Sequence, residues 1–223
     1  MLEPKDFFEL EGIELELFNG INYVWEALHN IKDFLSKYVK PEIRGKIIGG
    51  VFIEGEVFID EGTVVEPGVY IKGPAYIGKN CEIRQGAYIR GNVYVGDNCV
   101  VGHSTEIKNS ILLSKAKAPH FNYVGDSILG HNTNLGAGTK ISNLKIGPDS
   151  TIKIKIDDKV YDTGMRKLGA IIGDNSETGC NSVLNPGTII GKNVLIYPNA
   201  NVRGYIPPFT IVKFKPNLDF VNY

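Results

Sequence analysis

The chain has 223 residues, of which 43% are apolar, so it can form one large domain or two smaller ones with a real core. Its 24 basic and 25 acidic side chains leave a formal net charge of -1, which excludes a global positive field for nucleic acid or an anionic membrane. Any anionic ligand is therefore expected to bind at a local cluster of cations.

The first segment, MLEPKDFFELEG, is acidic and has no long apolar run, so we expect neither a signal peptide nor a membrane span, and a cytoplasmic protein. The next stretch, NYVWEALHNIKDFLSKYVK, has apolar residues at helical spacing (Val24, Leu28, Ile31 and Leu35), and Pro41 follows as a stop signal. We expect residues 1–46 to form an N-terminal helical cap or linker whose amphipathic helix closes the open end of the next domain.

From residue 47 to residue 206 the chain repeats every six residues. Consecutive hexads read IIGGVF, IEGEVF, IDEGTV, VEPGVY, IKGPAY, IGKNCE, IRQGAY, IRGNVY and VGDNCV, each beginning with Ile or Val. A period of six fits neither an α-helix nor a simple alternating strand, but it suits an all-β solenoid whose short parallel strands meet at corners. The aliphatic residue is expected to face a narrow core, and Gly, Asn or Asp to take the turns.

Two stretches interrupt the hexads. Residues 113–123 are expected to be a loop insertion, and loops on a rigid scaffold tend to carry function. In residues 147–170, Ile152, Ile154 and Ile156 alternate with lysines before a DDK turn, so we expect a β-hairpin insertion. The hairpin is either a solvated arm or one that covers ligand or reaches a neighbouring subunit. Residues 207–223 are expected to form a C-terminal tail.

Cysteines and histidines outside the interruptions give few functional signals. Cys81, Cys99 and Cys180 are an odd number without CxxC spacing, which argues against a disulfide framework and a zinc site. We expect all three to be small buried residues and expect no metal to be required. His103 and His131 occupy what look like ordinary turn positions.

The hexads resemble the hexapeptide-repeat family, whose fold is a triangular, left-handed parallel β-helix with three hexads in each coil. Roughly twenty hexads then imply about seven coils. The stretches STEIKNS and SKAKAPHFNYVGDSILGHNTNLGAGTKISN are similar to the acetyltransferase domain of the bifunctional glucosamine-1-phosphate N-acetyltransferase/UDP-N-acetylglucosamine pyrophosphorylases. DTGMRKLGAIIGD resembles the related archaeal sugar-1-phosphate nucleotidyltransferases with amino-sugar acetyltransferase activity.

This resemblance implies site residues, carried over position by position. The expected catalytic residues are His120, which takes a proton from the attacking amine, and Glu106, which orients it. The expected ligands of an amino-sugar phosphate are Arg84, Lys108, Lys117, Tyr123, Asn134, Asn143 and, in place of a lysine on a shorter loop, Lys167. Acetyl-CoA is expected near Ala137, Gly138, Cys180 and Pro198, although the family has Ser and Ala at the last two positions.

The chemistry suits these residue types. An imidazole with a reference pKa of about 6.5 accepts a proton near neutral pH, and backbone N–H groups of the Gly136–Gly138 turn can face an oxyanion. The resemblance therefore implies an acetyl-CoA-dependent N-acetyltransferase acting on an amino-sugar phosphate such as glucosamine- or galactosamine-1-phosphate, in a homotrimer with sites between neighbouring copies. Two alternatives stay open: an acyltransferase with another amino-sugar or hydroxyl acceptor, and a non-catalytic oligomerisation or regulatory subunit of a separate nucleotidyltransferase.

Overall fold

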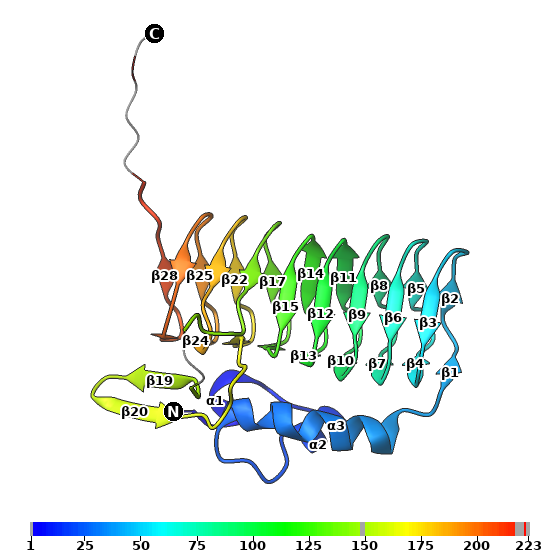
Figure 1. Ribbon diagram of the computed structural model, residues 1–223, viewed down its shortest axis with the longest axis horizontal. Coiled ribbons are helices and arrows are strands. Elements are labelled where there is room, and N and C mark those ends of the chain that lie inside the picture. Colours follow the sequence, from blue (N-terminus) through cyan, green and yellow to red (C-terminus); the bar gives the residue numbers. More distant parts are fainter. Residues whose placement is uncertain (1, 148–149, 217–220, 222–223) are drawn as a thin grey trace.

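In the computed structural model, which describes residues 2–147, 150–216 and 221, the hexads form short strands that stack into three parallel sheets (Figure 1). Sheet A has the strand order β1 (Glu42–Ile43), β4 (Val57–Ile59), β7 (Ala75–Ile77), β10 (Val93–Val95), β13 (Ser110–Leu112), β16 (Ile128–Leu129), β21 (Ala170–Ile172), β24 (Thr188–Ile190) and β27 (Tyr205–Ile206). Sheet B has the order β2 (Lys46–Ile47), β5 (Val64–Val65), β8 (Glu82–Ile83), β11 (Val100–His103), β14 (Lys117–His120), β17 (Asn134–Leu135), β22 (Glu177–Thr178), β25 (Leu195–Ile196) and β28 (Ile211–Val212). Sheet C comprises β3 (Phe52–Glu54), β6 (Tyr70–Lys72), β9 (Tyr88–Arg90), β12 (Glu106–Lys108), β15 (Tyr123–Gly125), β18 (Lys140–Ile141), β23 (Val183–Leu184) and β26 (Asn201–Val202). The parallel β-solenoid expected from the six-residue period is confirmed.

The core of the solenoid is built by the first residue of each hexad. A run of nine such residues is fully buried: Ile59, Val65, Ile71, Ile77, Ile83, Ile89, Val95, Val101 and Ile107. At the corners, asparagines take the left-handed backbone conformation, which Asn tolerates better than most residues; Asn80, Asn98, Asn132, Asn175 and Asn193 have φ between 53° and 60°. Both expectations about the hexad are therefore confirmed.

The solenoid is longer than expected. Its strands run from Glu42 to Val212, beyond residues 47–206 at both ends, and its nine-stranded sheets give about nine coils instead of about seven. The count of hexads fell short because coils differ in length. Ala75 pairs with Val93, 18 residues later, whereas Val93 pairs with Ser110, 17 residues later. A coil that is one residue short hides its hexads without interrupting the sheets.

The expected loop insertion at residues 113–123 is wrong for the same reason. β14 lies inside this stretch and pairs with β11, with Val100 opposite Lys117 and His103 opposite His120. The stretch is therefore a regular part of a shortened coil, and His120 stands on a sheet edge instead of a free loop.

Sheet A carries a helical layer on its outer face. The elements of this layer are α1 (Pro4–Phe7), α2 (Glu14–Leu17), the 3-10 helix η1 (Val24–Glu26) and α3 (Ala27–Tyr38). The expected amphipathic helix is confirmed as α3, in which Leu28, Ile31 and Leu35 are buried. In the described part of the chain, no helix is both long enough and apolar enough to cross a membrane.

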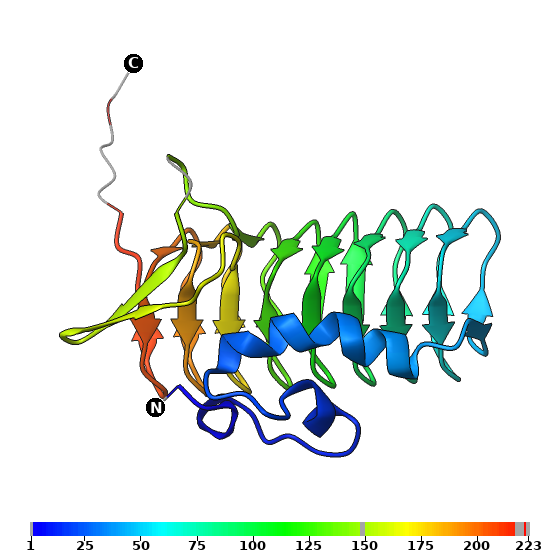
Figure 2. The same cartoon turned by 60° about the horizontal axis from the view of Figure 1, so that its bottom comes forward.

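The helix α3 covers a side of the solenoid, not its open end as expected (Figure 2). Sheet A is apolar on both faces, because outward residues such as Phe58, Tyr76 and Tyr94 alternate with inward ones. Phe34 of α3 meets Tyr94 edge to face, with 5.4 Å between ring centroids. Burial of this second apolar face gives the helix a larger contact area than a solenoid end would offer.

The inserted hairpin is confirmed as the antiparallel pair β19 (Lys153–Ile156) and β20 (Lys159–Asp162). Its alternation separates Ile154 and Ile156, which are buried, from Lys153 and Lys155, which are exposed. Tyr161 of β20 meets Tyr23 at 5.8 Å between ring centroids, so the hairpin continues the layer that covers sheet A. The expected ranges 147–170 and 207–223 include residues 148–149, 217–220 and 222–223, which lie outside the described residues.

Candidate active site

The corner that joins sheet B to sheet C gathers the proposed catalytic base and the residues expected near the acyl donor. They stand on turns of successive coils: His120, then Ala137 and Gly138, then Cys180, then Pro198. Backbone hydrogen bonds link these turns, since the N–H of Gly138 donates to the His120 carbonyl at 3.0 Å and the N–H of Asn199 donates to the Cys180 carbonyl at 2.9 Å. The five residues therefore form one row along an edge of the solenoid.

His120 is exposed at this corner, and Asn122 fixes its backbone. The N–H of His120 donates to Asn122 Oδ1 at 3.1 Å, and the Asn122 amide donates to the Gly136 carbonyl at 2.8 Å. Asn122 is buried, and the sequence analysis gave it no role. Among the described residues no hydrogen bond reaches the imidazole of His120, so its ring nitrogens are open to a ligand.

The Gly136–Gly138 turn has fewer available N–H groups than the sequence suggested. The N–H of Gly136 donates to the Thr178 carbonyl at 2.8 Å, and that of Gly138 is bound to His120. In the described ranges, no hydrogen bond engages the N–H of Ala137. Ala137 is thus the one member of this turn whose N–H can meet an oxyanion.

Lys117 and Asn134 are neighbours on the outer face of sheet B, where β14 and β17 pair them in register. Both line a surface hollow of about 620 Å³, together with Asn98, Lys115, Asn132 and Glu177. Arg84 follows β8 on the same sheet, but its guanidinium is bound to Glu82 at 2.7 and 2.9 Å.

Glu106 and Tyr123 lie in register on the neighbouring strands β12 and β15 of sheet C. The Glu106 carboxylate meets Arg90 at 2.6 Å. Within the described residues no hydrogen bond joins Glu106 to His120, so the expected orienting contact is not formed in this single chain.

Arg90 is a candidate that the sequence analysis missed. β9 pairs with β12, with Ile89 opposite Ile107, so Arg90 and Lys108 hold equivalent positions on successive coils. Their spacing of one full coil in the sequence is the signal that could have identified the pair. Because Arg84 lies on sheet B, Arg90 is the better placed cation to act with Lys108.

Asp126 organises the corner between sheets C and A. It is 4% exposed and accepts hydrogen bonds from Lys108 Nζ at 3.0 Å, from Asn109 at 2.8 Å and from Asn143. The sequence motif contained Asp126 but gave no reason to assign it a role. The structure shows that it holds two of the expected sugar-phosphate ligands, Lys108 and Asn143.

Tyr123 and Lys167 approach the same corner. The Tyr123 hydroxyl and the Asn143 amide lie 2.8 and 2.7 Å from the point that a Cβ on Gly125 would occupy, so a larger residue there would displace them. The N–H of Leu168 donates to the Asn143 carbonyl at 3.0 Å, which brings the exposed Lys167 to this corner. The expected ligands thus form two groups, one on sheet B and one beyond sheet C, with the row of His120 between them.

Cys180 and His131 differ from their expected roles. Cys81 and Cys99 are buried as expected, but Cys180 is exposed because it takes a turn position and not the inward position of a strand. Among the described residues, no group of three or more His, Cys, Asp or Glu side chains is placed to hold a metal ion.

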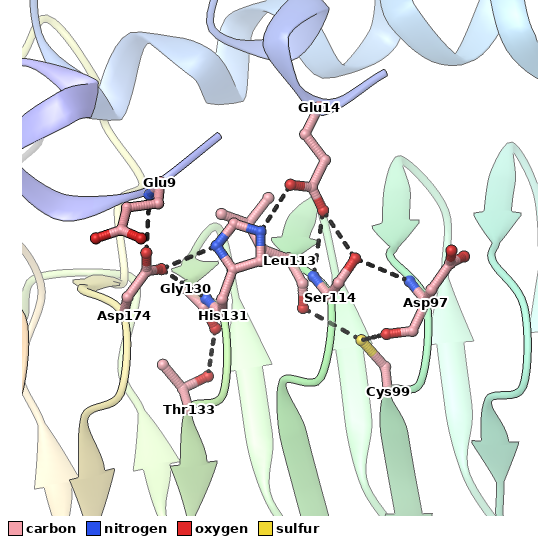
Figure 3. Close-up of polar contacts among 10 residues, drawn as sticks. All are labelled: Glu9, Glu14, Asp97, Cys99, Leu113, Ser114, Gly130, His131, Thr133 and Asp174. Carbon is pink, nitrogen blue, oxygen red and sulfur yellow. Dashed lines mark hydrogen bonds and ion pairs between the residues drawn. The ribbon is translucent and has the colours of Figure 1, made fainter. Parts of the chain in front are cut away.

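His131 fastens the N-terminal segment to the solenoid (Figure 3). Its Nε2 lies 2.7 Å from Glu14 Oε2, and its Nδ1 lies 3.1 Å from Asp174 Oδ1. Glu14 also accepts a hydrogen bond from the Ser114 hydroxyl at 3.1 Å, and both carboxylates are buried. Burial alone would lower the pKa of His131, but the hydrogen bonds and charges of Asp174 and Glu14 outweigh it and raise the pKa to about 9.

Known proteins with similar sequences share the repeats. The family model "GMPPB C-terminal domain" matches residues 71–161, and "Bacterial transferase hexapeptide (six repeats)" matches residues 169–204. "Bifunctional protein GlmU" of Methanococcus maripaludis (strain C7) is 51% identical over 211 residues, which are 94% of this chain and 51% of that protein. The "Bifunctional sugar-1-phosphate nucleotidylyltransferase/acetyltransferase" of Sulfurisphaera tokodaii is 38% identical over 87% of this chain and 47% of that protein.

A solved structure of PerB from Caulobacter crescentus, in complex with CoA and GDP-perosamine, is 22% identical over 52% of this chain and 56% of that one. Its TM-score of 0.37 is too low to bear on the arrangement of the site. The chain spans about half the length of the two curated relatives above. The six-residue period, the three parallel sheets and the matches to hexapeptide proteins together show that the chain belongs to the hexapeptide-repeat family of left-handed parallel β-helices.

Proposed function

We propose that the chain is an acetyl-CoA-dependent N-acetyltransferase that acts on an amino-sugar phosphate such as glucosamine-1-phosphate. The observation that carries this proposal is the row of turns at the corner of sheets B and C. There an exposed imidazole without a protein partner among the described residues stands next to the free N–H of Ala137 and the turns of Cys180 and Pro198. The acetyltransferase named among the relatives also supports this reaction class.

The reaction needs a base, an oxyanion donor and a leaving thiolate. The amine nitrogen attacks the thioester carbonyl carbon and gives its proton to His120, while the N–H of Ala137 donates to the carbonyl oxygen as it becomes negative. The C–S bond then breaks, the amide carbonyl forms and coenzyme A leaves as a thiolate, which takes up a proton. Cys180 and Pro198, on the next two turns, would border the pantetheine arm.

The acceptor phosphate is expected to bind the cations beyond sheet C. Arg90 and Lys108 are stacked there, and Tyr123, Asn143 and Lys167 lie close by. Arg90 is paired with Glu106 in this structure. A dianionic phosphate competes for Arg90, and its binding would free the Glu106 carboxylate to orient the imidazolium of His120.

Lys117 and Asn134 face away from that cluster, and this placement supports a homotrimer whose sites lie between copies. In such an assembly the sheet B face of one copy closes the corner of the next. The test is to co-assemble Lys117→Ala chains with Tyr123→Ala chains, because mixed trimers then contain a site with neither substitution. Activity above that of the two variants assembled separately supports shared sites; no gain shows that each copy holds a complete site.

The acceptor is identified by mass spectrometry of reactions with acetyl-CoA and either glucosamine-1-phosphate or galactosamine-1-phosphate. An added acetyl group on the amine of one of them supports the proposal. Acetylation only of another amino sugar or of a hydroxyl compound would move the assignment to that acceptor. A folded oligomer that transfers no acetyl group, but stimulates a separate nucleotidyltransferase, would favour the scaffold alternative.

A further inference from the structure

The hollow on sheet B differs from the rest of the site in its charges. Each cation expected to hold the sugar phosphate on sheets B and C has a carboxylate partner, apart from Lys117: Arg84 with Glu82, Arg90 with Glu106, and Lys108 with Asp126. In the part of the chain that the structure describes, no ion pair involves Lys117 or its neighbour in the hollow, Lys115. Two uncompensated ammonium groups therefore face the same surface hollow.

Lys115 occupies a turn position where the adjacent coils have asparagine. Its φ is 68°, beside 58° at Asn98 and 54° at Asn132, so all three take the left-handed conformation. That conformation costs a residue with a Cβ roughly 1 kcal/mol, and Asn is the common exception. Lysine brings no backbone advantage there, but it adds a positive charge to the hollow. Its occurrence at this turn points to a role for the charge.

The other lining side chains provide donors and one opposing charge. The Asn132 amide donates to Asn175 Oδ1 at 3.1 Å, whereas Asn98 and Asn134 offer amides at the rim and at the floor of the hollow. Glu177 lies opposite Asn134 in register and brings a carboxylate. The hollow has room for a phosphate group and retains one net positive charge.

We propose that this hollow binds a phosphate group through Lys115 and Lys117, with Asn98 and Asn134 as further donors. It shares Lys117 and Asn134 with the acetyltransferase site, so its place in that reaction rests on the function proposed above. Lys117 precedes His120 by three residues of β14, which is about 10 Å along the strand. Only four bonds separate the amine nitrogen of a hexosamine-1-phosphate from its phosphorus. A sugar phosphate in the hollow would therefore present its amine to a neighbouring copy, whereas a phosphate of coenzyme A fits the distance within one copy.

The binding of inorganic pyrophosphate, measured by calorimetry on the full chain, tests the hollow without any assumption about the reaction. Lys115→Asn restores the residue of the adjacent coils and is expected to keep the fold while weakening binding about tenfold. Glu177→Gln removes the opposing charge and should tighten binding about threefold. Lys155→Ala, on the exposed face of the hairpin, removes the same charge as Lys115→Asn and should leave affinity unchanged.

Equal affinities of Lys115→Asn and Lys155→Ala for pyrophosphate would overturn the proposal. The same variants titrated with coenzyme A and with glucosamine-1-phosphate identify the source of the phosphate, since only the natural ligand loses affinity with Lys115→Asn. If the wild type binds neither compound, the proposed function fails, but the pyrophosphate titration still decides whether the hollow is an anion site.

Discussion

The imidazole of His131 and the carboxylate of Glu14 lie 2.7 Å apart although 117 residues separate them in the chain. Both ring nitrogens of His131 face carboxylates, because Asp174 lies on the other side at 3.1 Å. Asp174 also accepts a hydrogen bond from the N–H of Glu9 at 2.8 Å. This buried group of charges attaches the N-terminal segment to the coil next to the strand that carries His120.

The His131 group predicts a loss of stability at alkaline pH. The folded state raises the pKa of this histidine from 6.5 to about 9, so its contribution is complete below pH 6.5 and disappears as the pH rises through 9. The contribution amounts to about 3 kcal/mol at most. We expect the free energy of unfolding in urea to fall between pH 6.5 and 9.5 in the wild type, and to fall much less in His131→Gln. Parallel curves for the two proteins, or an NMR titration of His131 near pH 6.5, would contradict this.

The packing of α3 on sheet A predicts a second effect on stability. Phe34→Ala is expected to cost about 3–5 kcal/mol, because Phe34 is 5% exposed and its loss leaves a cavity beside Tyr94. Phe52→Ala is the matched control, since Phe52 is 68% exposed on sheet C and should change the free energy of unfolding by about 0.5 kcal/mol or less. Similar losses in the two variants would mean that α3 does not pack on sheet A in solution.

The contact between Lys108 and Asp126 is suited to a double-mutant cycle with alanine substitutions. The pair is largely buried and shares its carboxylate with two amides, so we expect a coupling of about 1–3 kcal/mol in the free energy of unfolding. The exposed pair of Lys72 and Glu54, 3.6 Å apart, serves as the comparison and should couple by less than about 0.5 kcal/mol. Additive effects at Lys108 and Asp126 would show that Asp126 does not hold the lysine.

The sequence predicted those features that depend on short-range periodicity. The six-residue repeat placed Ile83 and Ile89 in the core, and the alternation of Ile154 and Lys155 identified the hairpin. The seat of α3 was also readable in principle, because the middle residues of strands such as β4 and β10 are aromatic.

Contacts between distant segments could not be predicted in this way. The partner of His131 depends on where the N-terminal layer lies on sheet A, and no local pattern encodes that position. The pairing of Glu106 with Arg90 depends on the register of successive coils, which a shortened coil changes. The grouping of site residues on two faces likewise follows from the three-sided cross-section and not from their order in the motif.

The release of free thiol from acetyl-CoA in the presence of the amino-sugar phosphate tests the central claim most directly. His120→Ala should lower the rate by about 10²- to 10⁴-fold, because it removes the proposed base. His103→Ala is the matched control, since His103 is exposed, pairs in register with His120 and lies one coil earlier. A rate that falls in His120→Ala and persists in His103→Ala is the predicted result; equal rates in wild type and His120→Ala, with both proteins folded, would contradict the account.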